Sequence, residues 1–408
     1  MNYNEQYFID LLSAFVNETE ITAKPSVDWE EIHRLSKLHS VSGIVGYMAD
    51  RLPKDNNPGE SIAEKLSHEY YGTIIASAKK DFAMQNLMME FEKAEIPLVI
   101  MKGFVVKDYY PVKELRTFGD IDLLIKKDDR QKTHALMMQL GFTARVDYGE
   151  VWEYIRDDEY YEIHTQIVSE YIAPNAAGVE YFNKAWDNVV IVDGSYIYNF
   201  TPEYHLLYIL QHIAKHINGN GAGIRMFMDI AVYLNYFSNL KWDYILQGLE
   251  KLNLRQFADN VFALCHRWFC MESPFETMDL DSVFYDEMCD YVLSAGTFGF
   301  YGRNHSAFIV RREITNSKHK HAKGVAKIKA LRSFFFPAYS VIKISYTFIE
   351  GKPYLLPVAW FVRAFKVMTP KRGPVANRIG EMMSGADEAL EQYDLLSKLG
   401  LTECNRKQ

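Results

Sequence analysis

Two aspartates stand two residues apart in segment 118–125, whose sequence FGDIDLLI is otherwise apolar. In a strand, successive side chains point to opposite faces, so Asp120 and Asp122 would share one face of a half-buried strand. Two like charges side by side are unfavourable unless a cation neutralises them, and oxygen ligands without cysteine suit Mg²⁺ or Mn²⁺. The pair indicates a metal site of the kind that binds phosphoryl oxygens. An ordinary solvated strand entered through a turn at Gly119 explains the same residues.

A third carboxylate, Glu162, lies in the strand-like segment 160–168, and His164 follows it on the same face. A neighbouring strand would bring Glu162 alongside Asp120, where a third ligand is needed if two metal ions are to be held. We predict that Asp120, Asp122 and Glu162 bind the metal and are catalytic, with His164 next to the nucleotide. Either Glu162 or His164 alone would be ordinary on an exposed strand face.

Residues suited to phosphate binding precede the aspartates. Lys102 and Gly103 end the short apolar run 98–101. A glycine at a strand-to-helix turn lets backbone N–H groups approach a phosphate, and a lysine adds positive charge. Arg116 and Gly119 lie just before the aspartate pair. We predict that these four residues contact the nucleotide; a simple turn and a solvated arginine are the alternatives.

Histidines recur in a helical pattern further along the chain. His205, His212 and His216 are spaced by seven and four residues and so share one helix face, and Arg225 and Asp229 are four apart on the next helix. A zinc site would need a third ligand that the pattern does not supply. We predict that His212, His216, Arg225 and Asp229 form a polar cluster that contacts the nucleotide or the acceptor, with a structural hydrogen-bond network as the alternative.

Four regions must position these residues. We expect a helical region over 1–95, a catalytic core over 96–200, a helical domain over 201–300 and a basic, aromatic-rich helical region over 301–408. The first includes a long helix from about residue 61 to 94, and the core reads β-α-β-α-β-β. This order predicts an α+β fold, with a small mixed sheet and its helices inserted between helical flanks.

The composition is that of a globular protein, with 48% hydrophobic and 24% charged residues in 408. Four cysteines are too few and too scattered for a disulfide framework and are expected to be free thiols. The N-terminal sequence lacks the basic and apolar regions of a signal peptide, and no run approaches the ~20 apolar residues of a membrane span. We therefore expect a cytoplasmic protein without a transmembrane segment.

The charge is unevenly distributed. Between residues 311 and 372 there are 14 Lys and Arg against two acidic residues, a local charge of +12. Because the net charge of the whole chain is −8, the remaining residues together carry a charge of −20. Such a split indicates an anionic partner for the basic segment 311–332, either nucleic acid or a membrane surface. A solvated helix that covers the acidic half is the alternative.

Taken together, these motifs resemble a bacterial family of uncharacterised nucleotidyltransferases in the DNA polymerase β-like superfamily. The resemblance lies in Met101–Gly103, Tyr109–Pro111, Arg116, Gly119–Leu124, Glu162–His164, His212, His216, Arg225, Asp229, Tyr354–Pro357 and Arg363. It implies a mixed sheet bearing three metal-binding carboxylates between helical flanks. Lys102 and Gly103 stand where the wider superfamily has Gly-Ser, and the third acid is a glutamate rather than an aspartate.

The activity that the resemblance implies is transfer of a nucleoside monophosphate from an NTP, with ATP the first candidate, by a two-metal mechanism using Mg²⁺ or Mn²⁺. The acceptor hydroxyl is open and can belong to a small molecule, an RNA or a protein. Two other functions fit the same residues. One is a catalytically inert adaptor that binds nucleotide or RNA, and the other is an AMP-transferring regulator of a partner protein.

Overall fold

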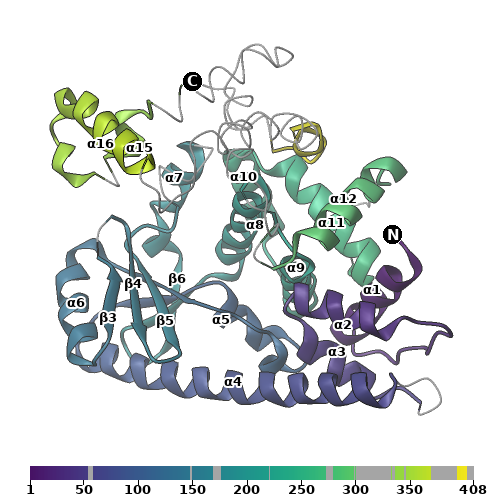
Figure 1. The fold of residues 1–408 in the computed structure, drawn as a ribbon. Helices are drawn as coiled ribbons and strands as arrows, with labels where there is room; N and C mark the ends of the chain where they lie inside the picture. The colour runs from purple at the N-terminus through teal and green to yellow at the C-terminus, as the bar shows by residue number, and fades with distance from the viewer. Residues whose placement is uncertain are drawn as a thin grey trace.

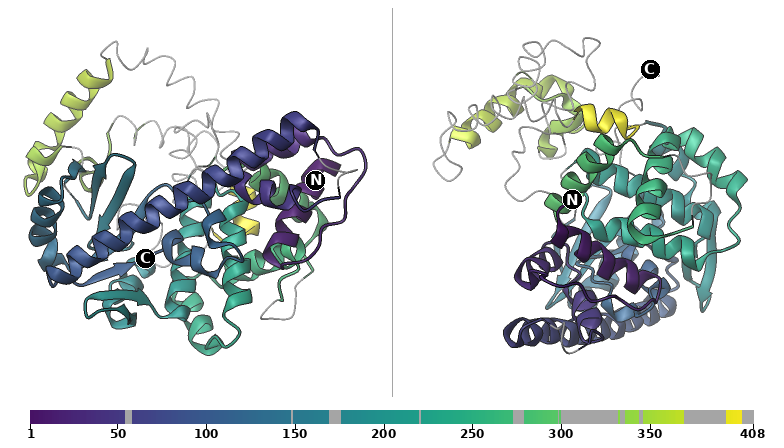
Figure 2. Two further views of the ribbon diagram at one scale, coloured as in Figure 1. Left: turned by 90° about the horizontal axis from the view of Figure 1, so that it is seen from below. Right: turned by 90° about the vertical axis from the view of Figure 1, so that its right-hand side faces the viewer.

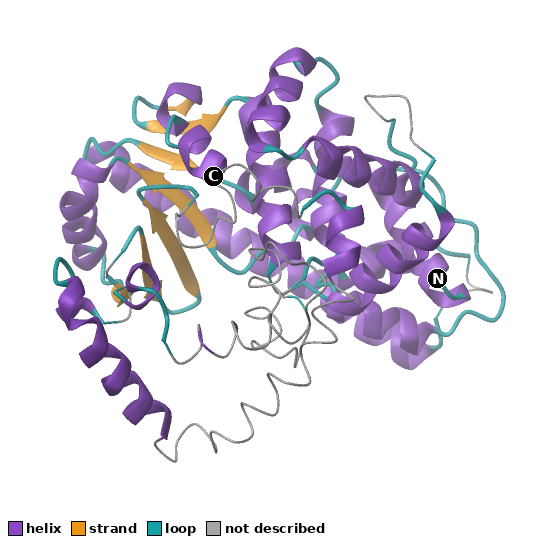
Figure 3. Ribbon diagram, turned by 90° about the horizontal axis from the view of Figure 1, so that it is seen from above, coloured by secondary structure: helices purple, strands orange, loops and turns teal. Residues whose placement is uncertain are grey.

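A computed structural model describes residues 1–53, 58–147, 149–168, 176–219, 221–272, 279–297, 299, 332, 336–343, 346–368 and 393–401. Strands gather on one side of the molecule and most helices on the other (Figure 3). Apart from Arg332, the basic segment 311–332 lies outside the described residues, so its predicted anionic partner stays a prediction.

One seven-stranded mixed sheet forms the strand-rich side of the molecule. Its strands are β1 (Leu98–Ile100), β2 (Ile121–Ile125), β3 (Thr143–Val146), β4 (Val151–Arg156), β5 (Glu159–His164), β6 (Val189–Asp193) and β7 (Ile197–Phe200). They lie in the order β3-β4-β5-β2-β1-β7-β6. β2 runs parallel to β5 and β1 runs parallel to β7, while the other neighbours are antiparallel. The predicted mixed sheet within an α+β fold is confirmed.

The strand β2 is buried along its whole length, so the expectation of a half-buried strand is wrong. Leu123 packs on one face of the sheet into an apolar cluster with Phe91 and Met137. Leu124 packs on the other face into the larger cluster that continues into the helices. Because both faces are covered, Asp122 sits in a strand with little access to water, which raises the need for a compensating charge.

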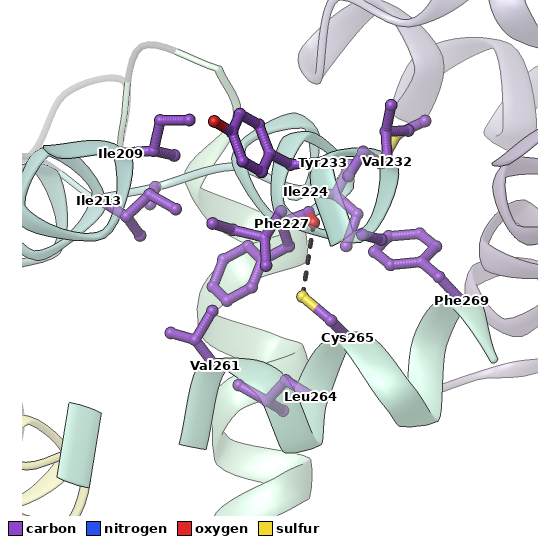
Figure 4. Packing of buried hydrophobic residues seen from close by; sticks show 14 of the residues in the cluster. Ile209, Ile213, Ile224, Phe227, Val232, Tyr233, Val261, Leu264, Cys265 and Phe269 are labelled. Atoms are coloured by element: carbon purple, nitrogen blue, oxygen red, sulfur yellow. Dashed lines mark hydrogen bonds between the residues drawn. The ribbon is translucent and has the colours of Figure 1, made fainter. Parts of the chain in front are cut away.

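Helices from the N-terminal region and from residues 202–295 build a single core. These helices are α1 (Tyr3–Val16), α2 (Trp29–Leu38), α3 (Ser42–Ala49), α8 (Pro202–Asn218), α9 (Ile224–Tyr236), α10 (Trp242–Leu252), α11 (Arg255–Phe269) and α12 (Ser282–Ala295). α1 packs against α11 and α9, and the larger cluster includes side chains from all eight. Figure 4 shows part of this core, in which the Cys265 thiol donates a 3.4 Å hydrogen bond to the Phe227 carbonyl. The predicted helical regions 1–95 and 201–300 therefore share one hydrophobic core.

A single long helix joins the N-terminal helices to the sheet. α4 (Glu60–Lys93) has 34 residues and so is about 51 Å long. It passes beneath both the N-terminal helices and the sheet (Figures 1 and 2). At its far end the Glu92 carboxylate accepts hydrogen bonds from the backbone N–H groups of Ser195 and Tyr196, at 2.7 and 2.9 Å. Its bounds agree with the predicted helix from about 61 to 94.

The remaining elements are shorter. They are α5 (Gly103–Val106), α6 (Arg130–Gln139), α7 (Ala176–Phe182), α15 (Tyr339–Ile342), α16 (Leu356–Met368) and the 3-10 turns η2 (Lys107–Tyr109), η3 (Lys113–Leu115), η4 (Lys127–Asp129), η5 (Ala185–Asn188), η6 (Thr347–Ile349) and η7 (Pro353–Leu355). Within the part of the chain that the structure describes, no helix has both the length and the apolar character needed to cross a membrane.

Candidate active site

The parallel pairing of β2 with β5 places Asp122 directly beside Glu162. His164 projects on the same face two residues later, and its Nε2 lies 3.0 Å from Asp122 Oδ1 and 3.5 Å from Glu162 Oε2. The side chains of Asp122 and His164 are each 8% exposed, and that of Glu162 is 25% exposed. We call these three residues the β2–β5 cluster. The sequence placed Glu162 alongside Asp120, and the register corrects this neighbour to Asp122.

Asp120 lies one residue before β2, at the edge of this cluster. Burial raises its pKa, and repulsion from the charges of Asp122 and Glu162 raises it further. Asp120 therefore belongs to the same negatively charged region. Among the described residues, the candidate ligand atoms that lie close to one another come from Asp122, Glu162 and His164, and Asp120 is not among them. Its role as a metal ligand stays a prediction.

Lys102 supplies the positive charge that the cluster needs. It follows β1 at the turn into α5 with φ 53° and ψ −129°, a left-handed conformation that non-glycine residues rarely adopt. Met101, the residue before Lys102, donates its backbone N–H to the Asp122 carbonyl at 3.1 Å. The Lys102 ammonium lies 2.6 Å from Asp122 Oδ1. Strained backbone of this kind persists where surrounding contacts over-determine it, as they commonly do at functional sites.

The charges of the cluster are settled by their neighbours. Burial alone would raise the pKa of Asp122, but the Lys102 ammonium and the hydrogen bond from His164 hold it far below its usual range. Burial would lower the pKa of Lys102, yet the Asp122 charge raises it. The hydrogen bonds to Asp122 and Glu162 likewise outweigh burial and raise the pKa of His164. Asp122 and Lys102 are therefore a charged pair at any ordinary pH.

One face of α8 is turned toward the cluster and carries Tyr208, His212, Lys215 and His216. The Tyr208 ring centroid lies 5.8 Å from the Lys102 ammonium nitrogen, and the two imidazole centroids lie 4.4 Å apart. Burial and the positive charge of Lys102 bring the pKa of His212 well below its ordinary value. Burial and the charges of Lys215 and Lys102 lower that of His216 to about 4. Both rings are therefore neutral near pH 7 and act as hydrogen-bonding groups, not as charges.

Arg116 and Asp229 form a separate buried pair. The guanidinium binds the carboxylate with both Nε and Nη2, at 3.1 and 2.6 Å, and the Tyr110 hydroxyl donates to the same carboxylate at 2.7 Å. The side chains of Arg116 and Asp229 are 8% and 9% exposed. A Cβ at Gly103 would lie 2.1 Å from Arg116 Nη1, which gives this glycine a packing role in addition to the predicted phosphate contact. The structure thus joins these two predicted nucleotide-binding residues to each other.

The loop that leads to Asp120 is tied down from three sides. Arg225 Nη1 donates to Thr117 Oγ1 at 2.8 Å, and the Thr117 hydroxyl donates to the Ser40 carbonyl at 2.6 Å. The Lys80 ammonium, from α4, donates to the carbonyls of Phe118 and Gly119. A Cβ at Gly119 would meet nothing within 4 Å, so packing does not explain this glycine.

Three residues of the site escaped the sequence reasoning: Lys80, Tyr208 and Lys215. Tyr208 lies four residues before His212 and Lys215 three residues after it, so the helical spacing that grouped the histidines also contained these two. Lys80 lies far from the motifs in sequence and carries no comparable signal.

The donor chemistry of the β2–β5 cluster fits a divalent cation. One ligand atom from each of Asp122, Glu162 and His164 lies within 4.8 Å of the other two. A positive charge is already favoured at this position, because the Lys102 ammonium is bound to the Asp122 oxygen that faces His164. Two carboxylates and an imidazole are ordinary ligands of divalent metals.

The family comparison agrees with the motifs. The sequence model of a family described as uncharacterised nucleotidyltransferase matches residues 25–270, more than half of the chain. The chain belongs to this family, and the matched range contains the β2–β5 cluster, α8 and α9. No curated protein matches the chain. Among solved structures, that of the antibiotic-resistance factor ANT(2'')-Ia is similar over 45% of this chain and 95% of its own, with 12% identity and a TM-score of 0.32.

Proposed function

We propose that the protein transfers a nucleoside monophosphate from an NTP to the hydroxyl of an acceptor and releases pyrophosphate. The observation that carries this proposal is the β2–β5 cluster, in which two carboxylates stand side by side on adjacent parallel strands with Lys102 bound to one of them. Membership of the nucleotidyltransferase family supports it.

In this reaction the acceptor oxygen attacks the α-phosphorus, and the bond from that phosphorus to the bridging oxygen of the β-phosphate breaks. Two Mg²⁺ or Mn²⁺ ions, held by Asp120, Asp122 and Glu162, would neutralise the leaving group and lower the pKa of the acceptor hydroxyl. Asp122 is suited to bind both metal ions because its carboxylate stays ionised. Most of the rate would come from positioning and electrostatic stabilisation, as is general for phosphoryl transfer.

Three cations near the cluster support a polyanionic substrate. Burial lowers the pKa of Lys80 and of Arg225, the latter to about 10, and partial desolvation lowers that of Lys215, whose side chain remains exposed to solvent. Neighbouring positive charges add to each shift: Lys102 acts on Lys215, and Arg116 acts on Arg225. A cation whose charged form is disfavoured by its surroundings gains from a nearby anion. We infer that a triphosphate lies among these side chains, with Lys102 released from Asp122 to bind it.

The direct test is transfer of label. The purified protein is incubated with each α-³²P-labelled NTP, with Mg²⁺ or Mn²⁺ and with a cell lysate, and the product is separated into protein, RNA and small molecules. The Asp122→Asn variant should lose about 10²–10³-fold in rate, the equivalent of several kcal/mol of metal-dependent stabilisation. Asp128→Asn, which changes an exposed carboxylate just beyond the same strand, should leave transfer unchanged.

The outcomes separate the competing functions. Label on a protein would identify an AMP-transferring regulator, and label on RNA or on a small molecule would identify the other acceptor classes. Nucleotide binding without transfer from any NTP would overturn the enzymatic proposal in favour of an adaptor. Equal rates for Asp122→Asn and the unaltered protein would refute the assignment of the site.

A further inference from the structure

We propose that His164 is itself a ligand of the divalent cation, so that Asp122, Glu162 and His164 form a mixed carboxylate–imidazole site that prefers Mn²⁺ to Mg²⁺. The inference deepens the proposed function and rests on it, because nucleotidyl transfer is the reason to expect a cation here. It differs from the all-carboxylate set of Asp120, Asp122 and Glu162 that the sequence predicts.

The position of one nitrogen atom carries the argument. Nε2 of His164 faces both carboxylates, at 3.0 Å from Asp122 Oδ1 and 3.5 Å from Glu162 Oε2. One oxygen from each carboxylate and one ring nitrogen of His164 lie within 4.8 Å of one another. A cation shared by the two carboxylates would therefore lie within reach of the imidazole. In the absence of a cation the same nitrogen hydrogen-bonds to Asp122.

The surroundings hold the imidazole in this position. His164 is the last residue of β5, where its backbone is paired with Leu124 of β2 on one side and Val151 of β4 on the other. Its side chain is 8% exposed. Asp120, by contrast, lies before the first residue of β2 and outside the mutually close ligand atoms of the described residues. A ligand fixed between two strands costs less to order around a metal than one on a loop.

Between Mg²⁺ and Mn²⁺, an imidazole ligand favours Mn²⁺. Mg²⁺ keeps oxygen ligands and near-ideal octahedral geometry, whereas first-row transition ions accept imidazole nitrogen. Replacing one carboxylate by an imidazole also lowers the negative charge of the site. Lys102 offers no lone pair and is not a ligand; it occupies Asp122 Oδ1 as a competing cation. We therefore expect Mn²⁺ to bind at least about 10-fold more tightly than Mg²⁺.

The experiment uses Mn²⁺ alone, with the full chain and no nucleotide. Free Mn²⁺ is measured by its electron paramagnetic resonance signal, with Mg²⁺ as competitor. Electron spin-echo modulation detects coupling between bound Mn²⁺ and imidazole nitrogen, and labelling histidine with ¹⁵N changes that coupling without altering any residue. His164→Gln should remove the coupling and weaken Mn²⁺ binding by well over about 100-fold, beyond the 10–100-fold typical of residues that only support a ligand. His68→Gln, at an exposed histidine of α4 far from the motifs in sequence, is the control and should retain both.

Nitrogen coupling in the unaltered protein that is lost only in His164→Gln would support the inference. Absence of coupling, or its persistence in His164→Gln, would overturn it and show that His164 only hydrogen-bonds to the carboxylates. If His164→Gln does not fold, absence of coupling in the ¹⁵N-histidine protein still overturns the inference, and coupling that survives in both His212→Gln and His216→Gln supports it. Coupling in a protein that transfers no nucleotide would contradict the proposed function and leave the metal site standing, whereas transfer without coupling would do the opposite.

Discussion

The buried pair of Arg116 and Asp229 allows a stability prediction with a matched control. Asp229→Asn keeps the shape of the side chain and removes its charge, so the Arg116 guanidinium is left buried without a counter-ion. Two hydrogen bonds of 3.1 and 2.6 Å from Arg116 and one of 2.7 Å from Tyr110 converge on this carboxylate. Removing one partner of such a pair costs about 3–5 kcal/mol, because the remaining charge stays desolvated.

The control uses the same two residue types in a solvated setting. Arg255 and Asp259 pair four residues apart on α11, with Nε 3.0 Å from the carboxylate and side chains 36% and 23% exposed. Asp259→Asn should cost only about 0.3–0.5 kcal/mol, as is typical of helix-surface ion pairs. Equilibrium unfolding in urea, with the slope checked for each variant, gives both free energies of unfolding.

The reasoning predicts a large difference between the two variants and a specific rescue. Exchange of both Arg116 and Asp229 for apolar residues of similar volume should recover much of the loss, because no uncompensated charge remains. A cost below about 1 kcal/mol for Asp229→Asn, close to that of Asp259→Asn, would refute the claim that burial makes this pair different.

Two further predictions concern packing and protonation. Gly103→Ala should destabilise the protein by about 1–3 kcal/mol, because the added Cβ would lie 2.1 Å from the fixed Arg116 guanidinium. The control is Gly72→Ala on α4, where an added Cβ meets nothing within 4 Å. In the same urea assay this variant should be neutral or slightly stabilising. Burial lowers the pKa of His205 to about 4, so unfolding takes up a proton below pH 6.5, and this residue costs stability as the pH falls from 6.5 toward 4. His205→Leu should therefore flatten the pH dependence in that window by up to about 3 kcal/mol, and the same change at exposed His68 should not; equal slopes would contradict the assignment.

Local patterns predicted the elements well where no long-range contact was needed. The long helix was predicted from about residue 61 to 94 because no proline or glycine breaks the run between Gly59 and Pro97 except Gly72, and the helix spans Glu60–Lys93. The hairpin of β6 and β7 was missed. Its sequence carried a signal, since Asp193 and Gly194 form a tight-turn dipeptide between two β-branched and aromatic runs.

The geometry of the site could be predicted only in part. Alternation along a strand correctly put Glu162 and His164 on one face. Alternation cannot give the register between β2 and β5, which lie on either side of a helix and a hairpin, and so the neighbour of Glu162 was assigned to Asp120 rather than Asp122. The pairing of Arg116 with Asp229 spans 113 residues, a separation at which no sequence spacing applies.

The long helix α4 has a consequence for which changes the chain tolerates. Near its start the backbone of Leu66 lies so close to Gly46 that a Cβ there would be 2.4 Å from the Leu66 carbonyl oxygen. Further along, Lys80 binds the loop before Asp120 and Glu92 binds the turn between β6 and β7. Adding one residue between these contacts would turn everything beyond it by about 100° and shift it by about 1.5 Å. Exposed side chains between them, such as Ile75 and Phe82, are free to vary, while the number of residues is not.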